Sequence, residues 1–183
     1  MKKHVAAVLV LATLVFALNA NAFVPQIKLS FDDQGERWWT NLPSDLVLDT
    51  LTVWTSGMGM YLAAIDYKIE YDPVLTFIED LMVGDALAIG TSVNGIAISY
   101  PTPGNAHDMF AVQRVVVMWN GTDCALHRDS PINIVPYPGK DRIEAIRWPD
   151  LWITEAQGVT SLVCPTSSPT QATTWGMVKT LYQ

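Results

Sequence analysis

The chain has 183 residues, of which 50% are hydrophobic and 16% are charged, and its formal net charge is −7 at pH 7. Apart from Lys2 and Lys3, its basic residues are scattered singly rather than gathered into a stripe, which excludes a nucleic-acid-binding surface. A chain of this length is typical of one domain with a sizeable hydrophobic core.

The first residues have the three parts of a secretory signal peptide. Residues 1–4 (MKKH) form a positive region, residues 5–18 form an apolar run, and Ala20-Asn21-Ala22 is a small-x-small cleavage site. The apolar run is too short to span a bilayer comfortably, and no later stretch is apolar enough to do so. We therefore expect residues 1–22 to be removed, leaving a secreted protein, periplasmic or extracellular, without a membrane span.

Alternation of apolar and polar residues predicts strands through the first half of the mature chain. Residues 23–32 form the first predicted strand, with Pro25 suited to a sheet edge, and residues 46–54 form the second. The clearest pattern covers residues 61–71, where one face carries Tyr61, Ala63, Ile65, Tyr67, Ile69 and Tyr71. This period of two is typical of a half-buried strand. A further strand is expected after the Asp72-Pro73 corner.

The second half contains shorter predicted strands separated by turn signals. Residues 86–89 are short and weakly patterned, Asn94-Gly95 is a hairpin signal, and the strand over 96–100 is expected to end at the loop of residues 101–104. Residues 109–119 are apolar on both faces, which predicts an interior strand, with a helix as the alternative. Residues 123–138 are predicted to be irregular apart from a short edge strand, and the remaining predicted strands cover 143–148, 151–154 and 159–164.

Turns recur about every 8 to 12 residues, which is the spacing of a β-sandwich or barrel. The sequence therefore predicts an all-β, antiparallel β-sandwich over residues 23–164. Residues 165–172 are a polar linker. The tail over 173–182 changes character, because its apolar residues are spaced as in a short amphipathic turn of helix.

The segment from Ile69 to Asp85 (IEYDPVLTFIEDLMVGD) resembles the corresponding part of cohesin-type domains. In those domains a strand ends in Tyr-Asp-Pro, resumes with alternating apolar residues, and runs into a Val-Gly-Asp turn. Proline cannot donate to the ladder, and the residue before it is kept extended, so strand pairing ends at this corner. The resemblance implies a cohesin-like or Ig-like jelly-roll sandwich, carbohydrate-binding or protein-binding, with partners such as dockerins. The chain after Trp119 does not follow the cohesin pattern.

Two cysteines, Cys124 and Cys164, lie downstream of the signal peptide. An oxidising compartment favours a disulfide between them. A metal site would need more soft ligands. A catalytic thiol would need a base, for which His127 is the nearest candidate in sequence.

The candidate ligand-binding residues are aromatic or lie in the Pro-rich loop. Trp38 and Trp39 are adjacent, so on a strand only one of them would face the core. The other is free to stack on a sugar ring or to anchor a partner protein. Tyr100 and His107 flank the loop that follows residue 100, and we expect them to contribute to the same ligand surface.

The acidic turn over residues 32–36 is a candidate calcium site. Asp32, Asp33 and Glu36 offer the hard oxygen ligands that Ca²⁺ prefers, although the turn lacks the alternating pattern of an EF-hand. A plain acidic turn is the alternative. The sequence indicates no other cofactor.

Motifs for catalysis are missing from the sequence. There is no Gly-x-Ser-x-Gly turn, no His-Glu-x-x-His and no Cys-x-x-Cys, and His107 and His127 each have only an acidic neighbour. We therefore expect a non-catalytic recognition or structural module that binds a glycan or another exported protein. The alternatives are an assembly protein whose C-terminal tail docks on a partner or acts in export, and an extracellular hydrolase.

Overall fold

The computed structural model describes residues 25–41, 47–59, 61–107, 109–120 and 123–165. This part of the chain is all-β, and none of it forms a helix able to cross a membrane. The strands are β1 (Gln26–Ser30), β2 (Trp39–Thr40), β3 (Leu48–Ser56), β4 (Tyr61–Glu70), β5 (Leu75–Met82), β6 (Leu87–Thr91), β7 (Gly95–Asn105), β8 (Met109–Trp119), β9 (Ser130–Val135), β10 (Ile143–Trp148), β11 (Ile153–Val159) and β12 (Ser161–Val163).

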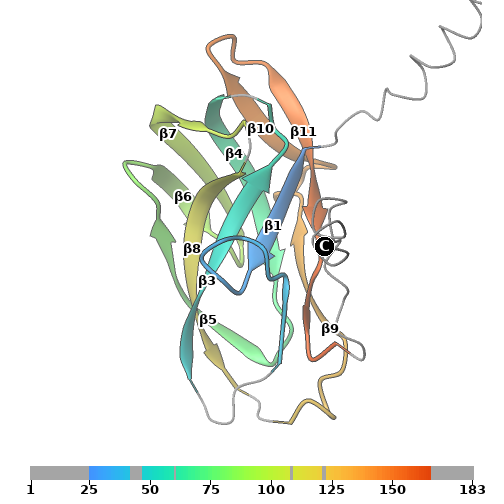
Figure 1. Ribbon diagram of the computed structural model, residues 1–183. Coiled ribbons are helices and arrows are strands. Elements are labelled where there is room, and N and C mark those ends of the chain that lie inside the picture. Colours follow the sequence, from blue (N-terminus) through green and yellow to red (C-terminus); the bar gives the residue numbers. More distant parts are fainter. Residues whose placement is uncertain (1–24, 42–46, 60, 108, 121–122, 166–183) are drawn as a thin grey trace, which may run out of the picture.

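The strands form a sandwich of two layers (Figure 1). One layer has the order β5-β8-β3-β1, with antiparallel neighbours throughout. The other has the order β6-β7-β4-β10 and is also antiparallel. Strand β11 pairs with β10 antiparallel and with β1 in parallel, so it joins the layers along one edge. The antiparallel β-sandwich predicted from the sequence is confirmed.

The core lies between the layers and is built from the inward side chains of both. In β4, Ile65, Tyr67 and Ile69 are at most 2% exposed, while Asp66 and Lys68 between them are half-buried. The opposite layer contributes apolar side chains that alternate in the same way, including Ile27, Leu29, Leu51, Val53, Val115 and Val117. The period of two in the sequence therefore identified the inward face of β4 over residues 65–69.

The start of β4 does not follow the predicted alternation. The register between β4 and β7 shifts between Leu62 and Ala64. The register between β4 and β10 shifts at the same place, between Ile146 and Arg147 of β10. As a result Leu62 is fully buried, whereas Tyr61 is 47% exposed. The prediction that Tyr61 lies on the inward face with Ile65 is wrong, because an irregularity in the ladder reverses which side chains point inward.

The predicted break over residues 101–104 is also wrong, since β7 continues to Asn105. Its pairing with β4 passes from Ser99 opposite Ala64 to Gly104 opposite Leu62. Pro101 and Pro103 lie in the stretch skipped by this register shift, so their missing N–H groups cost no ladder hydrogen bond.

The last strands differ in their limits from those expected. Strand β9 spans six residues where only a short edge was predicted, and β11 begins at Ile153 and continues to Val159. The predicted disulfide is confirmed, with Cys124 bonded to Cys164 and their Cα atoms 5.3 Å apart. The signal peptide expected over residues 1–22 and the helical turn expected over 173–182 lie outside the described residues.

Candidate partner-binding face

The outward face of the β6-β7-β4-β10 layer, called the outer face below, gathers apolar side chains that nothing in the described chain covers. Residues directly opposite each other in antiparallel strands share a face. The register places Leu87 opposite Ser99, Ile89 opposite Ala97, and Ala64 opposite both Ser99 and Ile146. One continuous surface therefore crosses all four strands.

A shallow groove of about 420 Å³ lies on this face. Leu87 and Ile89 form its wall on β6 and are 64% and 78% exposed. Ala64 and Ala97 are small side chains on the two central strands, which leaves the hollow between β6 and Ile146 on β10. The groove exists because the central strands carry small outward residues and the outer ones carry large aliphatic residues.

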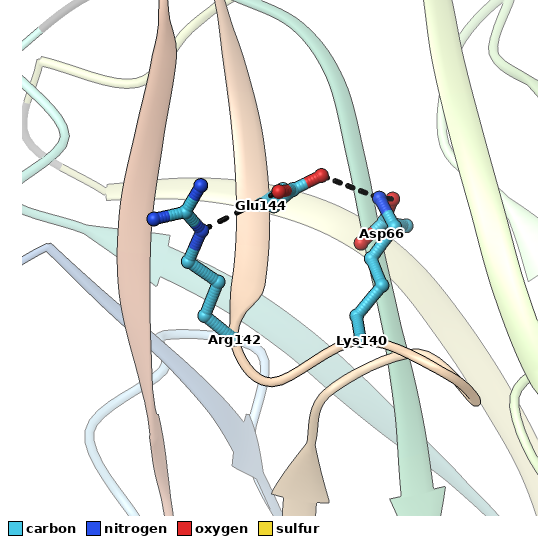
Figure 2. Close-up of polar contacts among 4 residues, drawn as sticks. All are labelled: Asp66, Lys140, Arg142 and Glu144. Atoms are coloured by element: carbon cyan, nitrogen blue, oxygen red, sulfur yellow. Dashed lines mark hydrogen bonds and ion pairs between the residues drawn. The ribbon is translucent and has the colours of Figure 1, made fainter.

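Four charged side chains form a network (Figure 2), and three of them, Asp66, Lys140 and Glu144, line the groove. The Lys140 ammonium lies between two carboxylates, 2.5 Å from an oxygen of Asp66 and 2.5 Å from an oxygen of Glu144. The second oxygen of Glu144 accepts a hydrogen bond of 3.4 Å from the Arg142 side chain. Asp66 and Glu144 are opposite each other in the β4–β10 ladder, so the lysine relieves a like-charge pair.

The network shifts the ionisation of its members. Hydrogen bonds from Lys140 hold the pKa of Glu144 below its usual range. Hydrogen bonds to Asp66 and Glu144 raise the pKa of Lys140. Both shifts favour the charged forms of Lys140 and Glu144, and by residue type the two basic side chains of the network balance its two acidic ones.

The predicted ligand-binding residues lie in different parts of the molecule. Trp38 and Trp39 are half-buried beside β12, where the Leu162 N–H donates to the Trp38 carbonyl oxygen. His107 is exposed, and its ring meets the Tyr61 ring edge-on at 5.2 Å between centroids. Strands β2 and β7 are not neighbours in the sheet, so the structure does not assemble these residues into one site.

Tyr100 is a core residue rather than an exposed one. It is 5% exposed, and its hydroxyl donates to the Val112 carbonyl oxygen at 2.9 Å. Burial raises the pKa of this hydroxyl well above its ordinary value.

The acidic turn over residues 32–36 uses its first carboxylate internally. Asp32 accepts hydrogen bonds from the Ser30 hydroxyl and from the backbone N–H groups of Glu36 and Arg37, at 2.7 to 3.0 Å. Burial opposes ionisation of Asp32, yet these bonds outweigh it and lower the pKa. Asp33 and Glu36 are exposed. Within the described residues no three acidic, histidine or cysteine side chains cluster as metal ligands. Calcium binding here stays a prediction.

Sequence reasoning missed the outer face. The sequence carries only a weak trace of it in β6, where the large residues Leu87 and Ile89 alternate with the small residues Ala88 and Gly90. That alternation normally places the larger side chains in the core, whereas here they point outward. Strand β6 stands at the end of its layer and pairs only with β7, and its residues are exposed on both faces because no second sheet covers them.

Comparison with known proteins identifies the fold. No family model matches the chain, and no curated protein matches it. Among solved structures, a cohesin module of a family 33 glycoside hydrolase from Clostridium perfringens is similar, with 9% identity over 78% of this chain and 98% of that one and a TM-score of 0.51.

Other cohesins align less well. The third ScaB cohesin of R. flavefaciens, solved with a group 1 dockerin, has 14% identity over 78% of this chain and 96% of that one, with a TM-score of 0.49. A non-cellulosomal cohesin from Archaeoglobus fulgidus has 12% identity over 81% and 95%, with a TM-score of 0.45. The resemblance to cohesins inferred from residues 69–85 is confirmed at the level of the fold: this chain is a cohesin-like β-sandwich.

Proposed function

We propose that the chain is a non-catalytic recognition module that binds another protein on its outer face. The observation that carries this proposal is the exposure of Leu87 and Ile89 above an apolar groove. Covering apolar surface is favourable by roughly 25 cal/mol per Å². Contiguous exposed apolar surface bordered by polar groups is characteristic of interaction sites on soluble proteins.

The ion-pair network supports the same use of the face. Protein interfaces combine an apolar centre with a polar rim, and the Asp66-Lys140-Glu144 cluster stands at the rim of the groove. Charges at a rim contribute mainly to orientation and association rate. Together with Arg142 the cluster has equal numbers of basic and acidic side chains, so it favours a partner that meets it with hydrogen-bonding groups rather than with a strong net charge.

Export is part of the proposal. The Cys124–Cys164 bond is the kind of cross-link that persists in oxidising compartments, which agrees with the signal peptide expected over residues 1–22. The partner would then be another exported or surface protein. A dockerin-like protein is one partner that the cohesin fold suggests.

The test compares two exposed isoleucines on opposite layers. Ile89 on β6 is 78% exposed and Ile78 on β5 is 46% exposed, so aspartate at either position leaves the core intact. Wild type, Ile89→Asp and Ile78→Asp are immobilised and exposed to the culture fluid of the producing cells. Bound proteins are identified by mass spectrometry and their affinities measured with purified components.

The expected result is a partner retained by wild type and by Ile78→Asp but lost from Ile89→Asp. Hydrogen exchange in the purified complex should slow over residues 87–91 and 97–99. Equal retention by all three proteins, or protection confined to the β5 layer, would contradict binding at the outer face.

The other expectations from the sequence keep their own tests. Sugar binding at Trp38 and Trp39 predicts that alanine at both positions abolishes binding to a glycan array. An assembly role for residues 173–182, which lie outside the described part of the chain, predicts that their deletion alters secretion or oligomer size.

A further inference from the structure

The turn between β10 and β11 exposes two tryptophans at the end of the sandwich. Trp148 is 49% exposed and Trp152 is 67% exposed, and Leu151 between them is 60% exposed. Among the tryptophans that the structure describes, Trp38, Trp39 and Trp54 are half-buried and Trp119 is in the core. Tryptophan is highly buried on average, so exposure of both indoles on one turn needs a reason.

This turn, the hairpin tip of residues 147–152, is held by its own hydrogen bonds rather than by the core. The Arg147 guanidinium binds the Asp150 carboxylate through two nitrogens, with Nε 3.0 Å from Oδ1 and Nη2 bonded to Oδ2. The Arg147 N–H donates to the Trp152 carbonyl oxygen at 2.9 Å. The Trp152 N–H reaches Asp150 Oδ1 at 3.4 Å.

The backbone of the tip is strained in one place. Leu151 has φ 55°, a left-handed conformation that bulky residues rarely adopt. Such a conformation persists only where the surrounding structure imposes it, and it is enriched at binding sites. The tip is therefore a preformed element, and presenting its indoles to a ligand costs little conformational entropy.

A second aromatic pair continues the surface onto the neighbouring strands. Trp148 is opposite Tyr61 in the β10–β4 ladder, so their side chains share a face. Tyr61 in turn contacts the ring of His107. A row of rings thus leads from the hairpin tip across β4 to the end of β7.

The polar groups of the tip restrict the chemistry of its ligand. Arg147 and Asp150 neutralise each other, and hydrogen bonding to Arg147 lowers the pKa of Asp150, so the pair stays ionised over a wide pH range. The guanidinium has five N–H donors, of which this pair uses two, and the carboxylate retains free lone pairs. The tip therefore offers aromatic faces beside donors and acceptors without a net charge.

We propose that the hairpin tip binds the sugar rings of a neutral glycan. The apolar C–H face of a pyranose ring lies on an indole, with Trp152 as the main platform and Trp148 with Tyr61 as a second one. Hydroxyl groups at the ring edge exchange hydrogen bonds with the side chains of Arg147 and Asp150. A protein covering the tip would have to desolvate this exposed ion pair, which is costly, whereas sugar hydroxyls replace the water around it.

The experiment is native affinity electrophoresis of the full chain in gels containing galactomannan, xyloglucan, mixed-linkage β-glucan or, as a charged comparison, polygalacturonate. At least one neutral polysaccharide should retard the wild-type protein, and polygalacturonate should not. Trp152→Ala should weaken the retardation roughly tenfold, the size expected for loss of an aromatic stacking contact with its buried area. Trp152→Phe should retain part of it.

Two controls keep this proposal separate from protein binding at the outer face. Ile78→Asp changes an exposed side chain on β5, and Ile89→Asp disables the groove, so both should be retarded like wild type. No retardation of wild type in any neutral polysaccharide overturns the proposal. So does equal retardation of Trp152→Ala and wild type, or loss of a protein partner as the only effect of Trp152→Ala.

Discussion

Removing the Cys124–Cys164 bond should cost this protein a large share of its stability. The bond joins residues 40 apart and closes a loop that contains β9, β10, β11 and β12. In the chain-entropy model, a cross-link across a loop of this length stabilises the folded state by about 4 kcal/mol, because it restricts the unfolded chain. Single domains have a total stability of about 5–15 kcal/mol. The double variant Cys124→Ala/Cys164→Ala should therefore remain folded at room temperature but with a much smaller margin.

The assay is urea unfolding followed by tryptophan fluorescence, on the oxidised wild type and on the double variant. Two changes are expected together: the free energy of unfolding falls by about 4 kcal/mol, and the dependence on urea steepens, because the unfolded chain without its cross-link exposes more surface. A fall of less than about 1 kcal/mol with an unchanged slope would refute the reasoning, since it would mean that the bond restricts the unfolded chain little.

Three further predictions concern single residues. Tyr67→Phe should raise the free energy of unfolding by about 1 kcal/mol, because its hydroxyl is fully buried and has no hydrogen-bond partner among the described residues; lower stability in urea unfolding would show that the hydroxyl is satisfied. Gly158→Ala should lower the free energy of unfolding by about 3 kcal/mol, since a Cβ there would stand 1.8 Å from the Ile134 carbonyl oxygen; a thermal melt like that of wild type would contradict this close approach. Lys140→Met should return the depressed pKa of Glu144 towards its usual value. The ion pair therefore stabilises the fold above the usual carboxylate pKa and loses this effect as pH falls through the lowered value; an unchanged NMR titration of Glu144 would contradict the assignment.

The sequence predicted the sandwich where local pattern and tertiary environment agree. In β4, each inward residue from Ile65 to Ile69 is apolar and each outward residue is polar, so periodicity alone identified the buried face. The strand over 109–119 was also predicted correctly, because the run Val115-Val116-Val117 favours a strand and β8 lies between β3 and β5. The disulfide between Cys124 and Cys164 was predicted from the oxidising compartment expected for an exported protein, not from the alternation of apolar and polar residues.

Prediction failed where pairing geometry decides the outcome. The prolines at 101 and 103 indicate a loop, yet the irregular stretch between β7 and β4 admits them without loss of a ladder hydrogen bond. Tyr100 was expected at a ligand surface because it borders that supposed loop, and the continuing strand instead buries it. Both errors arose because the local turn preference of the prolines was used to predict where strand pairing ends, whereas the pairing of β7 with β4 decides this.

The outer face shows why the candidate site could not be read from the chain. Alternation correctly places Ile65 and Tyr67 in the core, and it would place the larger residues of β6, Leu87 and Ile89, there as well. In the structure these two side chains instead lie at the surface. A period of two states only that two sets of side chains lie on opposite faces, and it does not say which face is covered. Coverage depends on whether another layer lies above the strand, and β6 stands at the end of its layer. An alternating strand with its larger residues outside is therefore recognisable only after the strand order is known, and that inversion is what exposes the apolar side chains of the outer face.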